Sequence, residues 1–292
     1  MGQPMALNLL RAGYALTVYN RTAERALPVQ AAGADVARTP ADVAAASQIV
    51  FINVADEIAL SEVLFGAAGA FEKLAPGSIV VDLGTTSPTT TRCFADRLAS
   101  SHVDWMDAPV SGGEVGAKAA TLSIMVGASV DTYTRVQPVL QCMGQNIVHI
   151  GEVGAGQVTK ACNQIVVSAT LLGVAEAIVF AQQQGVDATR VRTALLGGFA
   201  YSRILEVHGQ RMLDEAFVPG FRSRLHLKDL NLVHGEATAS GLDLPLTRQA
   251  LQVLDALVAS GSAELDSSAL IRVVRAASQL PQNENQQAND PE

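Results

Sequence analysis

QIVFINV at Gln48–Val54 and SIVVDL at Ser78–Leu83 are the two stretches that decide the fold class. Both are apolar at nearly every position and do not alternate with polar residues, which is typical of strands that are covered on both faces. The pair Pro76–Gly77 marks a turn directly before the second run. The two stretches therefore predict inner strands of a parallel sheet.

Strand-like and helix-like segments alternate around these two runs. This alternation is typical of βαβ units, and it predicts a doubly wound α/β fold with a mostly parallel sheet. The further strands are expected at Leu16–Tyr19, Val103–Met106, Leu122–Val126 and Ile147–Ile150, and the helices at Pro4–Ala12, Thr22–Gln30, Pro88–Ser100 and Asp131–Met143.

The character of the sequence changes after Gly156, where valine-rich strands stop. Helical patterns follow at Val158–Gln184, Ala188–Leu196, Ser202–Leu213, Leu225–Ala239, Leu246–Ser260 and Ser267–Ser278. We therefore expect an α/β domain at residues 1–152 and an all-helical domain at residues 153–280. The last residues, 281–292, hold no apolar residue larger than alanine and are expected to be a disordered tail.

Composition excludes several classes of protein. The chain has 292 residues, of which 20 are basic and 28 acidic, and the net charge of −8 argues against a nucleic-acid partner. Three widely separated cysteines do not make a disulfide framework and favour a reducing, cytoplasmic location. Five scattered histidines without a CxxC or HExxH pattern predict that no metal is bound.

One apolar segment, Ile165–Phe180, is long enough to raise the question of a membrane span. It is shorter than the roughly 20 residues that a span needs, and it contains Glu176. Glutamines flank it on both sides. We therefore expect a helix buried among other helices, with no membrane partner.

The chain begins with a glycine at the start of a predicted helix. In doubly wound sheets, a strand that runs into G-x-G-x-x-G places backbone N–H groups and a helix N-terminus against a dinucleotide pyrophosphate. Gly2 matches the last glycine of that pattern, but the strand and the first two glycines are absent ahead of it. Taken alone, a glycine that begins a helix is a weak signal, and a plain helix cap is its more frequent explanation.

A second cofactor signal follows the strand Leu16–Tyr19. Asn20, Arg21 and Thr22 lie about twenty residues past the phosphate turn, where doubly wound proteins read the ribose 2′ position. An acidic residue there favours NAD, whereas Arg21 offers a planar guanidinium suited to a 2′-phosphate. These residues favour NADP over NAD; the alternative is a solvated arginine at a strand end.

Motifs distributed over the chain, up to about Ser278, resemble those of the β-hydroxyacid dehydrogenase family, relatives of 3-hydroxyisobutyrate dehydrogenase and 6-phosphogluconate dehydrogenase. They are MGQPM at Met1–Met5 with Asn8-Leu9, DAPVSGG at Asp107–Gly113, TLSIMVG at Thr121–Gly127, Gly154-Ala155-Gly156 leading to Lys160 and Asn163, KDL at Lys228–Leu230, and DSSAL at Asp266–Leu270. The resemblance implies a Rossmann-type dinucleotide-binding domain followed by a helical domain that binds substrate and forms a dimer.

The sequence departs from the family pattern at its beginning. Family members carry a further strand and G-x-G-x-x before the position of Gly2, and this sequence shows neither. Because that strand is central in a doubly wound sheet, we expect a gap in the sheet where it would lie, as from a truncated or misassigned start. Smaller departures are Gly84, Ala120, Ala128 and Ser267, where the family often has other residues.

The resemblance implies roles for the residues that touch substrate. Lys160 is expected to be the catalytic proton donor, with Asn163 one helical turn beyond it. Asn163 is expected to act in catalysis, either by bonding the substrate hydroxyl or by holding Lys160, and Gln164 is the neighbouring candidate. Ser111, Gly112 and Gly113 are expected to hold the substrate carboxylate, because glycines let the backbone N–H groups approach an anion closely.

The resemblance also implies contacts to the cofactor. Thr85 follows the strand Ser78–Leu83 and is expected at the nicotinamide ribose, and Val54 and Ala55 are expected to line the cofactor at the neighbouring strand end. Lys228 is expected to contact cofactor or substrate from the helical domain, and Asp229 to orient it.

Together these residues predict an NAD(P)-dependent oxidoreductase. The segment Gly197–Ala200, with Ser202–Gly209 after it, most resembles the tartronate semialdehyde (2-hydroxy-3-oxopropionate) reductases. The expected reaction is therefore the reduction of tartronate semialdehyde to glycerate, with a small 3-oxo or 3-hydroxy acid as the partner. The alternatives are 3-hydroxyisobutyrate dehydrogenase or another short β-hydroxyacid dehydrogenase, and a truncated relative without catalysis. A homodimer or homotetramer is expected.

Overall fold

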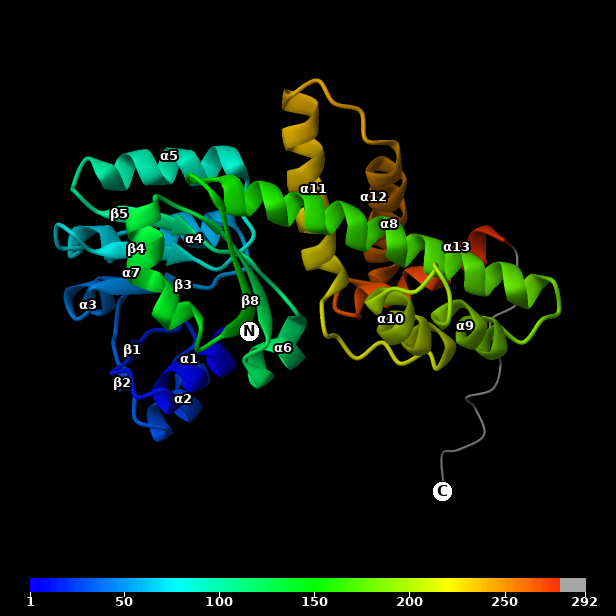
Figure 1. The fold of residues 1–292 in the computed structure, drawn as a ribbon, viewed down its shortest axis with the longest axis horizontal. Coiled ribbons are helices and arrows are strands. Elements are labelled where there is room, and N and C mark those ends of the chain that lie inside the picture. The colour runs from blue at the N-terminus through cyan, green and yellow to red at the C-terminus, as the bar shows by residue number, and fades with distance from the viewer. Residues whose placement is uncertain (279–292) are drawn as a thin grey trace. The chain divides into compact units, whose positions relative to one another are not determined.

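The computed structural model describes residues 1–278 and divides the chain into two units, Met1–Cys162 (unit 1) and Asn163–Glu292 (unit 2). Figure 1 shows that unit 1 combines strands with helices, whereas the described part of unit 2 consists of helices joined by loops. The predicted tail, residues 281–292, lies outside the described residues. The predicted order, a Rossmann-type α/β half and then a helical half, is confirmed.

Unit 1 contains all the strands of the described chain. The strands are β1 (Thr17–Val18), β2 (Asp35–Val36), β3 (Ile49–Ile52), β4 (Ile79–Asp82), β5 (Asp104–Asp107), β6 (Val110–Ser111), β7 (Leu122–Gly127) and β8 (Gly144–Gly151). The helices are α1 (Gly2–Arg11), α2 (Leu27–Ala31), α3 (Pro40–Ala45), α4 (Glu57–Phe65), α5 (Pro88–Ala99), α6 (Gly113–Ala119) and α7 (Val130–Leu140). The long helix α8 (Ala155–Gln183) starts in unit 1 and continues into unit 2.

The strands form two separate sheets. β1 and β2 make a parallel pair, and the other six strands form a sheet in the order β3-β4-β5-β7-β6, with β8 paired to β7. The pairs β3–β4, β4–β5 and β7–β8 are parallel, whereas β5–β7 and β6–β7 are antiparallel. The mostly parallel sheet is thus confirmed. The expected gap is also observed in residues 1–278, where β1 and β2 form a sheet of their own and no ladder joins either of them to β3.

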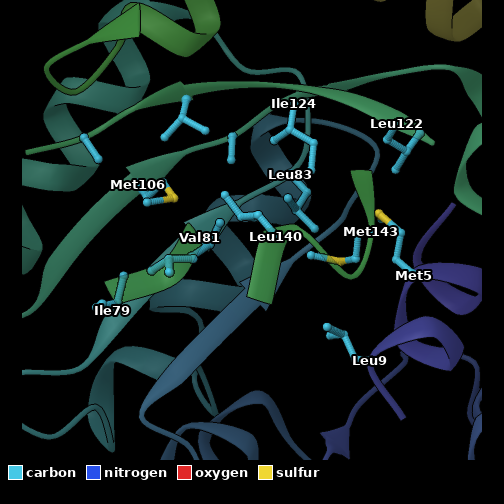
Figure 2. Close-up of a cluster of buried hydrophobic side chains, with 14 of the residues drawn as sticks. Met5, Leu9, Ile79, Val81, Leu83, Met106, Leu122, Ile124, Leu140 and Met143 are labelled. Carbon is cyan, nitrogen blue, oxygen red and sulfur yellow. The ribbon is translucent and has the colours of Figure 1, made fainter. Parts of the chain in front are cut away.

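The central strand β4 is buried on both faces, as its continuous apolar run predicts. Ile79 and Val81 face one cluster of buried side chains with α1, α6 and α7, which is drawn in Figure 2. Val80 faces the opposite cluster, with residues of α4 and α5. Because successive side chains of a strand point to opposite faces, one apolar strand supplies both cores.

Sequence patterns did not predict several short elements of unit 1. These are β2, β6 and the helices α3, α4 and α6. Helix α6 has the sequence GEVGAKA, in which two glycines conceal a helical period, and β6 is only two residues long. Gly113, which is expected to help hold the substrate carboxylate, is the first residue of this helix.

Unit 2 contains the remainder of α8 and the helices α9 (Ala188–Leu196), α10 (Arg203–Leu213), α11 (Ser223–Ala239), α12 (Pro245–Leu257) and α13 (Ile271–Ala277). Short helical turns lie at Ala23–Ala26, Ala70–Glu72, Val258–Ser262 and Ser267–Leu270. The predicted helices of this half are confirmed within a few residues at each end. In residues 1–278, α8 is the one helix long and apolar enough to cross a membrane, with a mean hydropathy of 1.9. The 18-residue stretch of α8 that gives this value is 50% buried.

Asp266 fixes the loop that precedes α11. Its carboxylate is fully buried and accepts hydrogen bonds from the backbone N–H groups of Gly220, Phe221 and Ser268 and from Arg211 Nη1, at 2.6 Å. Burial raises the pKa of Asp266, but hydrogen bonds from His208, Ser268 and Phe221 outweigh it and hold the pKa well below its usual range. Asp266 is therefore ionised throughout the neutral pH range.

Candidate active site

The carboxyl ends of β3, β4 and β5 meet at one edge of the sheet. The three strands are parallel, and Asp82 at the end of β4 is in register with Asp107 at the end of β5. The segments that follow these strands hold the predicted residues Val54, Ala55, Thr85 and Ser111. This edge is where nucleotides bind in doubly wound sheets.

Helix α1 begins beside the end of β3. A Cβ added to Gly2 would lie 3.6 Å from Asn53 Oδ1, just before Val54. No side-chain hydrogen bond caps this helix N-terminus. Its first backbone N–H groups are thus suited to bind an anion, which is the role expected for the turn at Gly2.

The segments after β3 and β4 approach each other closely. A Cβ on Gly84 would lie 3.3 Å from the backbone oxygen of Val54 and 3.0 Å from Asp82 Oδ1. Glycine permits this approach, so Gly84, noted above as a departure from the family pattern, fits tightly between these two groups. Thr85 follows it and is partly exposed, and Ala55 is exposed.

Three side chains hold the loop Gly84–Ser87 (the β4 loop). Asp82 accepts from the Gly84 N–H and, at 2.8 Å, from Thr86 Oγ1. Gln157 accepts from the Thr86 N–H and donates to the Gly84 carbonyl oxygen, and Glu57 accepts from the Ser87 N–H. Sequence reasoning assigned no role to Asp82, Gln157 or Glu57, because nothing in their spacing shows that they converge.

Asp107 caps α8. Its carboxylate accepts from the N–H of Gly154 at 2.7 Å and from that of Gln157 at 2.8 Å, and it is fully buried. Burial raises the pKa of Asp107 to about 6, against these two backbone hydrogen bonds, which lower it. Gly127 and Gly156 pack against Asp107. A Cβ added to either glycine would lie less than 3 Å from an oxygen of Asp107, so neither position has room for a side chain.

Lys160 is the sixth residue of α8, and its side chain reaches the segment that follows β5. Its Nζ donates to the backbone oxygen of Val110 at 2.9 Å, and the residue is only 8% exposed. Val110 directly precedes Ser111. The structure therefore brings the expected proton donor beside the expected carboxylate site, Ser111–Gly113.

The segment Ser111–Gly113 leads into α6 through two glycines with positive φ. Gly112 has φ +130° and Gly113 has φ +63°, conformations that favour glycine. Helix α6 is tied to α1, because Asn8 Nδ2 donates to the Ala117 carbonyl oxygen at 2.8 Å. Asn8, which the sequence motifs included without a function, thus joins the two helices that start at Gly2 and Gly113.

The expected 2′-phosphate residues lie at the end of β1. Asn20 Oδ1 accepts from the Thr22 N–H at 3.0 Å, which closes a tight turn around Arg21. All three residues are exposed. They follow β1 of the two-stranded sheet without being part of it, and no hydrogen bond between them and the β4 loop is found in the described residues.

Four predicted residues of unit 2 form a hydrogen-bonded chain. Asn163 Nδ2 donates to Gln164 Oε1 and Gln164 Nε2 donates to Asp229 Oδ2, both at 2.8 Å. Lys228 Nζ forms an ion pair with Asp229 Oδ1, also at 2.8 Å. Gln164 and Asp229 are buried, whereas Asn163 and Lys228 are partly exposed. The structure thus connects all four residues through the buried side chains of Gln164 and Asp229.

Comparisons with known proteins decide the family. The family described as the NAD binding domain of 6-phosphogluconate dehydrogenase matches residues 1–151, and that described as NAD-binding of NADP-dependent 3-hydroxyisobutyrate dehydrogenase matches residues 154–274. The 2-hydroxy-3-oxopropionate reductase of Escherichia coli (strain K12) is 44% identical over 94% of both chains. The chain belongs to the β-hydroxyacid dehydrogenase family.

Solved structures of similar proteins agree. Mycobacterium tuberculosis 3-hydroxyisobutyrate dehydrogenase with L-serine has a TM-score of 0.86 at 30% identity, covering 94% of this chain and 96% of that one. Psf3 in complex with NADP⁺ and 2-OPP has the same TM-score and coverage at 25% identity. This β-hydroxyacid dehydrogenase is therefore an oxidoreductase that uses NAD(P).

The residues at the sheet edge fit that cofactor. The α1 N-terminus offers N–H groups that no side chain caps, as a pyrophosphate requires. Gly84 packs closely against Val54, so that a Cβ there would lie 3.3 Å from the Val54 backbone oxygen. In residues 1–278, no group of three or more His, Cys, Asp or Glu side chains is placed to hold a metal ion.

Proposed function

We propose that this β-hydroxyacid dehydrogenase reduces tartronate semialdehyde to glycerate with NADPH as the hydride donor. The observation that carries the proposal is the Lys160–Val110 hydrogen bond, which holds an amine beside Ser111–Gly113. The similarity to the E. coli 2-hydroxy-3-oxopropionate reductase supports this substrate. So does the segment Gly197–Ala200, with Ser202–Gly209 after it.

When bound, the cofactor would supply the hydride for the aldehyde carbon. The protein must then protonate the oxygen and hold the carboxylate in place. We propose that Lys160 gives its proton to the forming alkoxide, since the Val110 carbonyl oxygen already orients its ammonium group. Lysine has three N–H donors, so one can stay on Val110 while another reaches the substrate.

Ser111, Gly112 and Gly113 are proposed to bind the substrate carboxylate. The Ser111 hydroxyl is a donor, and the glycines let backbone N–H groups approach an anion without a Cβ between them. Gly112 and Gly113 are both exposed. Because the carboxylate lies two bonds from the aldehyde carbon, holding it also fixes the reacting carbonyl near Lys160.

Asn163 is proposed to read the substrate hydroxyl. The side-chain amide of Gln164 accepts from Asn163 and donates to Asp229. Gln164 is therefore proposed to position Asn163 and not to contact the substrate itself. The Asn163 Oδ1 oxygen then accepts from the hydroxyl. A site that pairs with this hydroxyl discriminates against a methyl in its place, because its polar groups would be left without a partner.

The cofactor contacts are proposed from the positions at the strand ends. Gly2 is assigned to the pyrophosphate, Val54, Ala55 and Thr85 to the nicotinamide half, and Lys228 to the cofactor, with Asp229 orienting it. Asn20, Arg21 and Thr22 are assigned to the 2′-phosphate, with Arg21 as the charged contact. This assignment makes NADP the preferred cofactor.

We also propose the organisation of the whole molecule. Residues 1–152 would form the cofactor domain and residues 153–280 the domain for substrate and dimer formation. The exposed apolar side chains Val166 and Phe180 on α8 support a homodimer or homotetramer. The three free cysteines are compatible with a cytoplasmic enzyme. Light scattering during size-exclusion chromatography tests the assembly.

A substrate panel tests the proposed activity. Initial rates of NADPH oxidation are compared for tartronate semialdehyde and for the analogue with a methyl in place of the hydroxyl. The latter is the substrate type expected of a 3-hydroxyisobutyrate dehydrogenase, the activity named for the M. tuberculosis structure. We expect kcat/KM to favour tartronate semialdehyde at least about 100-fold. A preference for the methyl analogue would assign the alternative activity.

A further inference from the structure

We propose that Gln157 is a positioning residue that couples the β4 loop to the turn of α8 that carries Lys160. The inference rests on the proposed function for the identity of the proton donor and of the cofactor contact Thr85. It concerns how two parts of unit 1, separated by about seventy residues, keep a fixed distance from each other.

Gln157 has three hydrogen bonds to the end of β4 and its loop. Its Oε1 accepts from the Thr86 N–H at 3.2 Å, and its Nε2 donates to the Gly84 carbonyl oxygen at 3.0 Å and to Asp82 Oδ2 at 3.4 Å. The side chain is 1% exposed. It therefore binds the backbone on both sides of Thr85 and replaces the water that those groups would otherwise need.

The same residue is fixed at its own backbone. The Gln157 N–H donates to Asp107 Oδ2 at 2.8 Å, so its position on α8 is set by the end of β5. Lys160 follows three residues later, and its Nζ reaches Val110. Since i and i+3 lie on one face of a helix, a shift of Gln157 moves Lys160 with it.

The other side chains that hold the β4 loop do not connect it to α8. Asp82 alone already closes the loop through Gly84 and Thr86, and Glu57 holds the Ser87 N–H. The contribution specific to Gln157 is the connection from the β4 loop to α8. We infer that it fixes Thr85, the proposed contact for the cofactor, relative to the proposed proton donor, Lys160.

Gln157→Met tests the inference, because methionine keeps the length of the side chain and removes its hydrogen bonds. We expect kcat to fall about 10- to 100-fold, as for an active-site group displaced by about 1 Å, with a smaller change in KM for the substrate. The matched control is Thr159→Val, which removes a hydrogen bond inside the same part of α8, to the Ala155 carbonyl oxygen. The control should turn over within about twofold of the parent.

Amide hydrogen exchange gives a readout that does not depend on turnover. In Gln157→Met the Thr86 amide should exchange faster, since it loses its acceptor. The Ser87 amide should not change, since Glu57 still holds it. Equal protection of Thr86 in the variant and the parent would overturn the inference, as would a kcat within about twofold of the parent.

A double-mutant cycle on NADPH affinity separates coupling from general destabilisation. Thr85→Val should weaken NADPH binding less in the Gln157→Met protein than in the parent, whereas its effect should be unchanged in Thr159→Val. Additive effects in both backgrounds would contradict the coupling. If Gln157→Met does not fold, Gln157→Asn, which keeps the amide but shortens its reach, replaces it in every comparison.

These titrations and exchange rates need no substrate. If the parent fails to reduce tartronate semialdehyde, the proposed function fails, while exchange at Thr86 and the double-mutant cycle still decide the role of Gln157. If the parent is active and the Thr86 amide is unaffected, the proposed function stands and the inference about Gln157 is wrong.

Discussion

The amine of Lys160 donates a hydrogen bond to the backbone oxygen of Val110 at 2.9 Å. Val110 is itself held in the sheet, because β6 pairs with β7 at Val110 and Ile124. The amine is therefore fixed against rigid backbone, next to Ser111. This contact joins two sequence motifs that lie fifty residues apart, and the predictions below test what it implies.

Ser111→Ala should weaken binding of the substrate and leave binding of the cofactor nearly unaffected. The hydroxyl is proposed to donate to the carboxylate, and a hydrogen bond to a charged group contributes about 1.5–3 kcal/mol. We expect KM for the aldehyde to rise at least about tenfold, with Kd for NADPH within about twofold. Ser100→Ala, at an exposed serine of unit 1, is the control. A rise in the Kd for NADPH alone would move Ser111 to the cofactor site.

Gly112→Ala should lower turnover more than its cost in stability explains. Gly112 has φ +130°, and an added Cβ would lie 3.2 Å from Leu122 Cδ2. Gly77→Ala is the matched control, because Gly77 has φ +83° with nothing within 4 Å of its Cβ. Both variants carry backbone strain, but we expect only Gly112→Ala to bind the substrate more weakly and therefore to lose activity. Equal losses would remove the carboxylate role from this segment.

Arg21→Ala should erode the preference for NADPH over NADH. If the guanidinium binds the 2′-phosphate, its loss should lower kcat/KM with NADPH about tenfold or more and leave NADH nearly unchanged. Arg25→Ala, at a second exposed arginine close by, controls for net charge. Unchanged constants for both cofactors in Arg21→Ala would show that Arg21 is a solvated surface charge.

The pKa of Asp107 predicts a pH-dependent effect on stability. Its folded-state pKa of about 6 is above the value of an unfolded aspartate. The folded state therefore binds the proton more tightly, and this group's contribution to stability falls as pH rises from about 4 to 6. Relative to Asp107→Asn, the parent should lose about 2 kcal/mol of unfolding free energy between about pH 4.5 and pH 7.5. Urea denaturation at the two pH values measures it, and a constant difference would contradict the raised pKa.

The sequence was sufficient to predict the elements that bury apolar residues in a regular pattern. The runs that contain Ile49–Ile52 and Ile79–Asp82 are strands, and the helical half follows its predicted order. Short elements without such a pattern were missed. Strand β6 has only two residues, and the two glycines of α6 interrupt the spacing of apolar residues that predicts a helix.

The candidate site was predictable in part for a different reason. Lys160 and Ser111 belong to motifs that resemble a family, so their importance could be stated before their geometry. Asp107, Gln157 and Glu57 act through long-range hydrogen bonds, for which sequence spacing gives no signal. These contacts exist only after β4, β5 and α8 have packed, so tertiary structure was needed to find them.

Asp266→Asn should destabilise unit 2 strongly at neutral pH. The carboxylate is fully buried and holds Arg211 and three backbone N–H groups, and the amide leaves part of this set without an acceptor. We expect a loss of about 2–4 kcal/mol. Because the folded-state pKa is lowered, the stabilisation is present above the pKa of an unfolded aspartate and is lost as pH falls below about 4. A variant as stable as the parent at neutral pH would contradict this role.

The most direct test of the account is the rate of NADPH oxidation by Lys160→Met with tartronate semialdehyde. Removing a general acid costs roughly 10²–10⁴ in rate, so we predict a loss in that range with the Kd for NADPH within about twofold of the parent. Lys118→Ala, at an exposed lysine of α6 paired with Glu114, should retain full activity. A Lys160→Met protein that turns over within a few-fold of the parent would contradict the account.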